Sequence, residues 1–172
     1  MEVKVELIVR SCGGCTACCK THGVELISKK PGHWCGFCEI GKGCKVYEGR
    51  PIDCKTFKCL WLDNTIKTDS KLEEWHRPDI TKIVPTLNEM VGIGIVLWLW
   101  EVEEDSLATT FASGWTWRNL IRGRFVVHIP LVGNPKLLVP EGKDSTGLRF
   151  TFGNARKEFE IVQYRAGRFG PA

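Results

Sequence analysis

The second half of the chain, residues 80–164, has the hydrophobic pattern of a β-rich region. Short runs of Val, Ile, Phe and Trp alternate with turn sequences such as Gly133-Asn134-Pro135, as expected for successive strands. Residues 113–122 differ, because their Trp, Asn and Arg side chains repeat at helical spacing and predict a helix. The predicted strands cover residues 80–84, 91–103, 124–132, 136–139, 148–152 and 158–164.

The first half has a weaker periodicity and predicts short elements. Pro51 suits the first position of a helix, where its missing N–H costs nothing. Ser70 and Glu73 have the spacing of a capping box, which predicts a second short helix that ends near Arg77. The predicted elements are a strand at residues 3–9, a strand or turn at 24–27, and helices at 51–61 and 70–77.

These patterns predict an α+β fold. The chain has 172 residues, a natural size for one compact domain or for a small lobe fused to a larger one. We expect residues 1–62 to form a cysteine-rich lobe with short helices. This lobe would pack on a β-rich half, residues 63–172, so that the two form one continuous compact domain.

Composition narrows the class of protein. The hydrophobic content of 43% and the charged content of 26% are ordinary for a soluble globular protein. The longest apolar run, residues 91–100, is shorter than the roughly 18 residues that a membrane helix needs. The N-terminus lacks the uninterrupted apolar region of a signal peptide. We therefore expect a cytoplasmic protein without a membrane partner.

The net charge of +4 is too mild to indicate nucleic-acid binding by itself. The segment Trp115-Thr116-Trp117-Arg118, with Arg122 and Arg124, could stack on and clamp an anion. At this net charge we favour core positions for the two tryptophans, with the arginines reaching solvent. His76 and His128 belong to no recognised catalytic motif, and we expect structural roles for both.

All nine cysteines lie between residues 12 and 59, and residues 60–172 contain none. This clustering indicates a metal site, because soft sulfur ligands select zinc, copper(I) or iron–sulfur clusters. A disulfide framework fits less well, since it belongs to secreted chains and an odd count would leave one thiol unpaired. Inert buried thiols would not explain the two-residue gaps. We predict metal ligation by Cys12, Cys15, Cys18, Cys19, Cys35, Cys38, Cys44, Cys54 and Cys59.

The cysteine spacing also resembles that of a known family. The chain is similar to the CxxCxxCC cysteine-cluster family in three successive segments. These are Cys12-x-x-Cys15-x-x-Cys18-Cys19, then Cys35, then Cys44-Lys45-Val46-Tyr47-Glu48-Gly49-Arg50-Pro51-Ile52-Asp53-Cys54. That family is described as a zinc- or iron-chelating domain of the YkgJ type. The resemblance covers roughly residues 10–60 and implies metal binding without implying a reaction. The chain departs from the family at Cys38, where Leu is usual, so Cys38 is either an extra ligand or an apolar substitute.

Zinc is the metal that the spacing favours. The pairs Cys12–Cys15 and Cys35–Cys38 look like two halves of a zinc site. Arg50 could bind loop carbonyls or, with nearby lysines, balance the charge of the thiolates. Iron or an iron–sulfur cluster is the alternative, because a CxxCxxC run resembles the ligation of 4Fe–4S clusters. The adjacent Cys18 and Cys19 suggest either two sites or sulfurs that bridge two metals.

Some residues are weaker candidates for metal ligation. His22 and His33 lie close to cysteines in the sequence and could be ligands, although such histidines more often support a site or lie on the surface. Cys59 follows Cys54 by five residues, so on a continuous helix it points about 140° away. We therefore rank Cys38, which completes the second Cys-x-x-Cys pair, above Cys59.

Two classes of function fit this sequence. In the first, zinc holds the lobe together and the β-rich half recognises a protein or small-molecule partner. In the second, an iron–sulfur cluster or another metal gives the protein a redox or enzymatic role. Four sulfurs per ion favour the first class, whereas an open coordination position beside a pocket would favour the second. The sequence has no phosphate-binding loop and no motif for nucleophilic catalysis, so no residue is assigned to catalysis.

Overall fold

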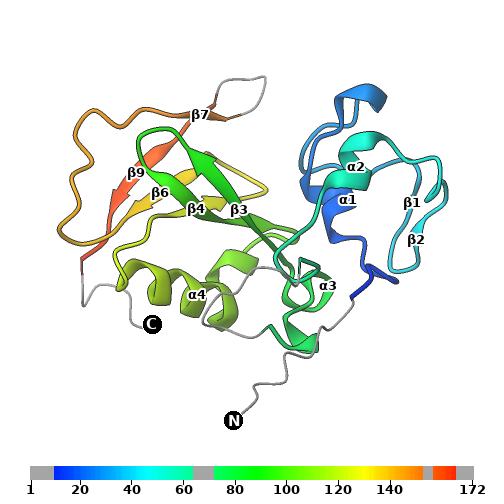
Figure 1. The fold of residues 1–172 in the computed structure, drawn as a ribbon, viewed down its shortest axis with the longest axis horizontal. Coiled ribbons are helices and arrows are strands. Elements are labelled where there is room, and N and C mark those ends of the chain that lie inside the picture. Colours follow the sequence, from blue (N-terminus) through cyan, green and yellow to red (C-terminus); the bar gives the residue numbers. More distant parts are fainter. Residues whose placement is uncertain (1–9, 64–71, 153–156, 166–172) are drawn as a thin grey trace, which may run out of the picture. The chain divides into compact units, whose positions relative to one another are not determined.

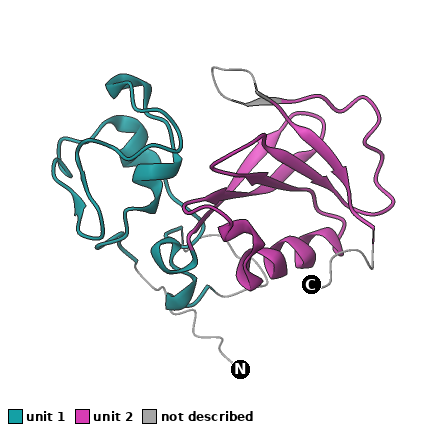
Figure 2. Ribbon diagram, turned by 180° about the vertical axis from the view of Figure 1, so that it is seen from behind, with its two compact units in different colours: residues 1–81 teal, residues 82–172 magenta. Residues whose placement is uncertain are grey.

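The computed structural model describes residues 10–63, 72–152 and 157–165, and Figure 1 shows the order of the elements along the chain. The chain divides into two compact units, residues 1–81 and 82–172, which have separate colours in Figure 2. The predicted cysteine-rich region ends at residue 62, whereas the first unit extends to residue 81. In the described part of the chain, no helix combines the length and the apolar character needed to cross a membrane.

The second unit is built on a five-stranded mixed sheet (Figure 1). Its strands are β3 (Ile83–Met90), β4 (Gly94–Glu101), β5 (Val126–Ile129), β6 (Lys136–Val139) and β9 (Glu160–Gln163), in the order β3-β4-β5-β6-β9. Neighbouring strands are antiparallel except for β4 with β5 and β6 with β9. Two short strands, β7 (Thr151–Phe152) and β8 (Lys157–Glu158), form a separate antiparallel pair. The α+β class and the β-rich second half are confirmed.

Helix α4 (Thr110–Leu120) lies in the crossover that connects the parallel strands β4 and β5. It follows a short 3₁₀ turn, η3 (Ser106–Ala108). The Ala112 N–H donates to the side-chain oxygen of Thr109 at 3.4 Å, which caps the first turn of α4. The helix predicted at residues 113–122 is therefore confirmed, and this cap explains its earlier start.

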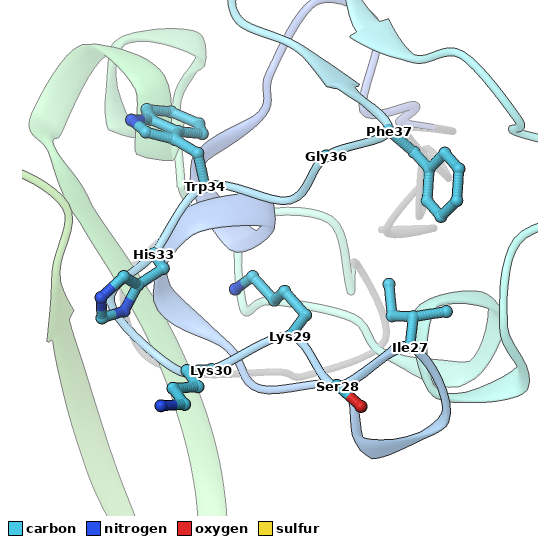
Figure 3. Close-up of a pocket in the computed structure, with 8 residues that line it drawn as sticks. All are labelled: Ile27, Ser28, Lys29, Lys30, His33, Trp34, Gly36 and Phe37. Carbon is cyan, nitrogen blue, oxygen red and sulfur yellow. The ribbon is translucent and has the colours of Figure 1, made fainter.

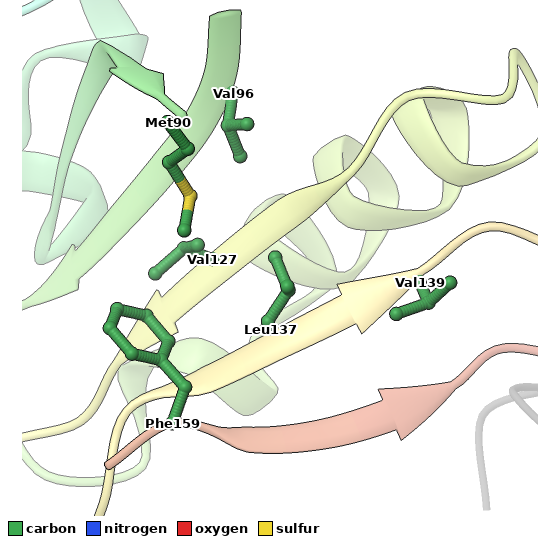
Figure 4. Close-up of a cluster of buried hydrophobic side chains, with 6 residues drawn as sticks. All are labelled: Met90, Val96, Val127, Leu137, Val139 and Phe159. Carbon is green, nitrogen blue, oxygen red and sulfur yellow. The ribbon is translucent and has the colours of Figure 1, made fainter. Parts of the chain in front are cut away.

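Residues on both faces of the sheet are buried. Along β5, Val126 and Val127 have no exposed surface, although they point to opposite faces. On the face of Val127, one hydrophobic cluster contains Met90, Val96, Val127, Leu137, Val139 and Phe159 (Figure 4). On the other face, His128 Nε2 lies 2.7 Å from the hydroxyl of Thr116, which belongs to α4. Helix α4 therefore covers that face.

The aromatic–basic segment of α4 is divided between core and surface. Trp115 is 9% exposed and lies in the core, as predicted, but Trp117 is 47% exposed and the predicted core position is wrong for it. Residues two positions apart on a helix differ by about 200° in direction, so only one of the two indoles can face the sheet.

His128 has a structural environment, as its sequence context predicts. Burial, and to a smaller extent the charge of Lys136, lowers the pKa of His128 to about 4. The imidazole is therefore neutral at pH 7 and shares its Nε2 hydrogen bond with Thr116. In the unfolded chain the same side chain would titrate near its ordinary value of 6.5.

We expect the second unit to lose stability as the pH falls from about 6.5 toward 4. The unfolded state then binds a proton at His128 that the folded state excludes, which lowers the unfolding free energy by about 2 kcal/mol at pH 5. Urea unfolding followed by the NMR signals of β5 and β6 would measure this loss at pH 7 and pH 5. In His128→Gln the loss should shrink, while His33→Gln, at an exposed site, serves as the control. An equal loss in His128→Gln would contradict the assignment.

The first unit consists of short elements joined by turns (Figure 1). They are α1 (Ala17–Thr21), η1 (Glu25–Ile27), β1 (Cys38–Glu39), β2 (Gly43–Cys44), α2 (Ile52–Thr56), η2 (Glu74–His76) and α3 (Pro78–Thr81). Residues 24–27, predicted as a strand or turn, form a turn closed by an isolated bridge between Val24 and Lys29. Strands β1 and β2 form an antiparallel hairpin.

The helix predicted at residues 51–61 is wrong in length, because α2 ends at Thr56. The Thr56 hydroxyl donates to the carbonyl of Ile52 at 3.0 Å within the last turn. Phe57 then adopts an extended conformation, and its ring centroid lies 4.1 Å from that of His22. This contact between distant segments outweighs the helical periodicity. Cys59 is consequently not on the helix that carries Cys54.

At the end of the first unit, one predicted helix and one predicted strand differ from the structure in their bounds. The helix predicted at residues 70–77 is shorter in its described part, where His76 Nδ1 accepts from the Glu73 N–H at 2.7 Å and closes a capping box around η2. This contact gives His76 a structural role. The strand predicted at residues 80–84 begins later, because Pro78 starts α3 and Lys82 turns the chain with a φ of +59°. The predicted strand at residues 3–9 and the Ser70 cap lie outside the described residues.

The first unit has little hydrophobic core. Among its described residues, the buried hydrophobic side chains are Ala17, Val24, Leu60 and Trp61. Large apolar side chains face solvent instead, among them Trp34, Phe37, Ile40, Tyr47, Ile52 and Trp75. So little apolar burial would leave a unit of this size marginal without additional cross-links.

Candidate functional site

The first unit contains two Cys-x-x-Cys turns of the same design. In each, the backbone N–H of the last cysteine donates to the carbonyl of the first, from Cys15 to Cys12 at 2.8 Å and from Cys38 to Cys35 at 3.0 Å. Gly13 has a φ of +50°, a left-handed conformation that glycine adopts at little steric cost. Each pair of sulfurs therefore belongs to one tight turn, as in metal sites with this ligand spacing.

Backbone contacts bring the two turns together. The loop of the β1–β2 hairpin approaches the first turn so closely that a Cβ on Gly14 would stand 2.6 Å from the Gly41 carbonyl oxygen. The Cys35 N–H donates to the Cys19 carbonyl at 3.0 Å, which ties the second turn to α1. The cysteine-bearing segments 12–19 and 35–44 therefore pack against each other through their main chains.

The hairpin adds Cys44 to the second turn. Cys38 and Cys44 are paired directly across the two antiparallel strands, an arrangement in which Cβ atoms are about 4.5–5.5 Å apart on the same face. Thr16 is buried beside this pair. Its hydroxyl hydrogen-bonds with the Cys38 sulfur and accepts from the Gly41 N–H at 3.2 Å.

Cys19 connects further thiols to this hairpin. Its thiol hydrogen-bonds with those of Cys18 and Cys38, and it interacts electrostatically with Cys54. The hydrogen bond with Cys18, followed by burial, raises the pKa of Cys19. Cys54 also interacts with Cys35 and Cys44. We refer to Cys18, Cys19, Cys35, Cys38, Cys44 and Cys54 as the main cysteine group.

Burial favours the protonated thiol at two cysteines of this group, Cys38 and Cys54. Burial, followed by the electrostatic interaction with the nearby Cys19, raises the pKa of Cys38 to about 11. Burial also raises the pKa of Cys54. At neutral pH the Cys38 and Cys54 thiols therefore keep their protons unless a cation takes their place. Binding of a thiophilic metal ion would therefore release protons from the group.

Lys29 supplies a positive charge to the main cysteine group. Burial lowers the pKa of Lys29, and electrostatic interaction with several of these thiols, Cys19 foremost, opposes that shift. The ammonium donates to the carbonyl of Lys20 at 2.9 Å and to that of His22. These carbonyls belong to the C-terminal end of α1, where a helix favours a cation. Lys29 is thus fixed between the helix end and the thiols.

Cys12, Cys15 and Cys59 form a second cysteine group, which Cys12 links to the main group through an electrostatic interaction with Cys19. Cys59 interacts electrostatically with the other two. Backbone N–H groups donate to these sulfurs, from Ala17 to Cys15 and from Leu62 to Cys59. Such hydrogen bonds stabilise a thiolate, but burial outweighs them and raises the pKa of Cys15 to about 11. The early end of α2 is what allows Cys59 to join this group.

Asp79 adds a carboxylate to the second cysteine group. The Cys15 thiol donates to this carboxylate. Arg77 holds the carboxylate from the other side, with Nε 2.6 Å from Oδ1 and Nη2 3.0 Å from Oδ2. The Arg77 guanidinium also lies over the Trp61 ring, 6.0 Å from its centroid. The carboxylate is therefore oriented by two donors before any ligand binds.

Arg50 lies near the same group. Its Nη1 donates to the Tyr47 carbonyl at 3.1 Å, and its guanidinium stacks on the Tyr47 ring at 3.6 Å from the centroid. Burial raises the pKa of Cys12, and the charge of Arg50 opposes this rise. The predicted contact of Arg50 with a loop carbonyl is confirmed, and the balancing of thiolate charge stays a prediction.

The two histidines considered as ligands make other contacts. His22 Nδ1 lies 2.7 Å from the Thr21 hydroxyl. Burial, followed by the charge of Lys29, lowers the pKa of His22 to about 3, so its ring is neutral. His33 is exposed, with Nδ1 3.1 Å from the Pro31 carbonyl oxygen.

The cysteine sulfurs lie in the same unit, but they do not form a ready set of ligands for one metal ion. Within residues 10–63, 72–152 and 157–165, no three His, Cys, Asp or Glu side chains are placed to hold one metal ion. All nine cysteines are free and half-buried. The donor set suits a thiophilic metal in kind, because it offers many soft sulfur atoms, backbone N–H donors to them and a nearby cation. Metal ligation by these cysteines stays a prediction.

Comparison with protein-family models, with curated proteins and with solved structures finds no match to this chain. The resemblance to the CxxCxxCC cysteine-cluster family therefore rests on the sequence motif of residues 12–54 and stays a prediction.

The structure adds three residues that the sequence analysis missed. Thr16 and Asp79 each hydrogen-bond with a thiol and Lys29 interacts electrostatically with several, yet none of the three belongs to the spaced cysteine pattern. Thr16 and Lys29 lie near cysteines in the sequence, so a search for polar neighbours could have flagged them. Asp79 reaches Cys15 only through the fold of the unit, and no sequence signal indicated it.

Proposed function

We propose that the first unit binds thiophilic metal through its cysteine thiolates, with zinc as the favoured metal, and that this metal stabilises the unit. The observation that carries the proposal is the gathering of nine free, half-buried thiols in a unit with few buried hydrophobic side chains. A structural zinc site contributes folding free energy directly, which would replace the missing core. The resemblance of the cysteine run to a zinc- or iron-chelating family supports the same conclusion.

Each of the two cysteine groups would supply thiolate ligands to metal. The main cysteine group would supply thiolates from α1, the hairpin and α2, with Lys29 offsetting part of their negative charge. The second group, Cys12, Cys15 and Cys59, would supply thiolates next to the Asp79 carboxylate. When bound, zinc would supply a fixed positive centre that has no redox chemistry of its own.

An iron–sulfur centre with a redox or enzymatic role is the second candidate. One zinc ion takes four ligands, whereas the main cysteine group offers more sulfurs than that and includes the contacting neighbours Cys18 and Cys19. A surplus of adjacent thiolates suits a polynuclear centre. This candidate names no substrate.

Anaerobic purification with metal analysis and absorption spectroscopy tests the proposal. A colourless protein with stoichiometric zinc would support a zinc-stabilised module. Stoichiometric iron with acid-labile sulfide and charge-transfer absorption in the visible region would support the second candidate. A chain that is purified without metal, and that binds neither Zn²⁺ nor Fe²⁺ when each is added under reducing conditions, would overturn both.

A further inference from the structure

The first unit contains a pocket of about 390 Å³ between η1 and the second Cys-x-x-Cys turn. Figure 3 shows its walls, which include Ile27, Lys29, Lys30, His33, Trp34 and Phe37. This volume is within the range of small-molecule sites, roughly 300–1,000 Å³. None of the described lining residues is a cysteine, and Lys29 is the lining residue that also interacts electrostatically with the main cysteine group.

The charge of the pocket is positive. Lys29 and Lys30 line it, and none of the lining residues that the structure describes is acidic. Lys20 adds a third ammonium at the edge, 5.6 Å from the centroid of the Trp34 ring. Lys29 already donates to backbone carbonyls, whereas Lys30 is exposed and can reach a ligand. A ligand with a negative group is therefore complementary to the pocket.

The walls of the pocket also carry exposed aromatic surface. Trp34 is 38% exposed and Phe37 is 44% exposed, although side chains of this size are usually much more buried. Flat aromatic faces pack best against a planar apolar group, and a cation beside such a face selects an anionic substituent on it. The pocket thus combines an apolar aromatic surface with a positive charge that favours an anionic head group.

We propose that this pocket binds a small organic anion with a planar apolar body. The body packs on Trp34 and Phe37, and a carboxylate or phosphate group is held by Lys30 with support from Lys29 and Lys20. Trp34 and Gly36, which both line the pocket, flank Cys35 of the main cysteine group. The bound anion therefore lies beside the cysteine cluster without depending on a metal for its own contacts.

Titration of the full-length chain with three matched probes tests this proposal. The probes are 2-naphthoate, 2-naphthyl phosphate and the neutral 2-naphthalenemethanol, with affinity from calorimetry and location from backbone NMR shifts. We expect the anionic probes to shift the amides of residues 27–37 and to bind up to about fivefold more tightly than the neutral one, as one partly exposed ion pair predicts. The tighter of the two anions identifies the preferred head group.

Two variants with matched controls separate charge from apolar contact. Lys30→Gln should remove the preference for anions, and Lys55→Gln, which lies outside the pocket, should not. Trp34→Leu should weaken all three probes, and Trp75→Leu should leave them unchanged. Shifts outside residues 27–37, equal affinity for the neutral probe, or an unchanged preference in Lys30→Gln would each overturn the proposal.

The unmodified chain already decides between anionic and neutral probes, so the test stands even if one variant fails to fold. Metal content measured on the same samples keeps the two proposals apart. We expect Lys30→Gln and Trp34→Leu to retain metal. Loss of probe binding with metal retained supports the pocket proposal and leaves metal binding untouched.

Discussion

Removal of metal by a strong chelator is expected to unfold residues 12–59 while the five-stranded sheet of the second unit keeps its structure. The first unit buries few apolar side chains among its described residues, whereas strands β3 to β6 contribute a continuous hydrophobic cluster. A structural zinc site in a small domain contributes on the order of 10–16 kcal/mol of apparent binding free energy at neutral pH. This is as large as the whole stability of a typical domain, about 5–15 kcal/mol.

Hydrogen exchange followed by mass spectrometry measures, in one experiment, the unfolding of residues 12–59 and the retained structure of the sheet. Peptides from residues 12–59 should lose protection after chelation, and peptides from β4, β5 and β6 should retain it. Adding back one metal at a time should restore protection with the native metal only. Unchanged exchange across residues 12–59 after verified removal of metal would contradict a stabilising role for the metal.

Replacement of Cys19 by serine is expected to cause the largest loss of metal among the nine single Cys→Ser variants. Cys19 contacts Cys18 and Cys38 and interacts with Cys54, so its thiol connects α1, the hairpin and α2. A hydroxyl is a hard, protonated donor that replaces a soft thiolate poorly. Changes to residues that only support ligands already cost roughly 10–100-fold in affinity, and loss of a ligand should cost more than about 100-fold.

Metal-to-protein ratios of the nine variants, prepared side by side, test this order. Cys38→Ser should lose more metal than Cys59→Ser, because Cys38 shares the main group with Cys19 while Cys59 lies with Cys12 and Cys15. If the two groups hold separate ions, Cys19→Ser should keep the metal of the second group. Full occupancy in both Cys18→Ser and Cys19→Ser would exclude the main cysteine group as a metal site.

The hydrophobic pattern predicted the strands of the second unit well where short apolar runs stand between turn residues, as Leu137–Val139 do in β6. It missed residues 85–90 of β3, where Pro85 and the polar Asn88 and Glu89 break the pattern. Strand β3 is at the edge of the sheet, and an edge strand tolerates a proline that a central strand would not. Local pattern alone does not say which strand is at the edge.

In the first unit, cysteine spacing identified the two Cys-x-x-Cys pairs but not the contacts around them. The pairing of Cys38 with Cys44 depends on hairpin register, and the contact of Cys15 with Asp79 depends on where α3 lies. Helical periodicity overextended α2, because the contact between Phe57 and His22 is made by segments far apart in sequence. Such contacts are tertiary, so the ligand candidates could be listed from sequence while their grouping could not.

The position of Lys29 has a consequence for how the cysteine cluster responds to salt. Its ammonium is bonded to the carbonyls at the end of α1, so the neutralising charge is part of the folded chain and does not come from mobile counterions. Mobile ions screen exposed charges over about 8 Å at physiological ionic strength, but they screen a half-buried charge much less. A thiolate cluster held beside Lys29 therefore carries its own counterion, and its electrostatic balance is set by the polypeptide more than by the surrounding electrolyte.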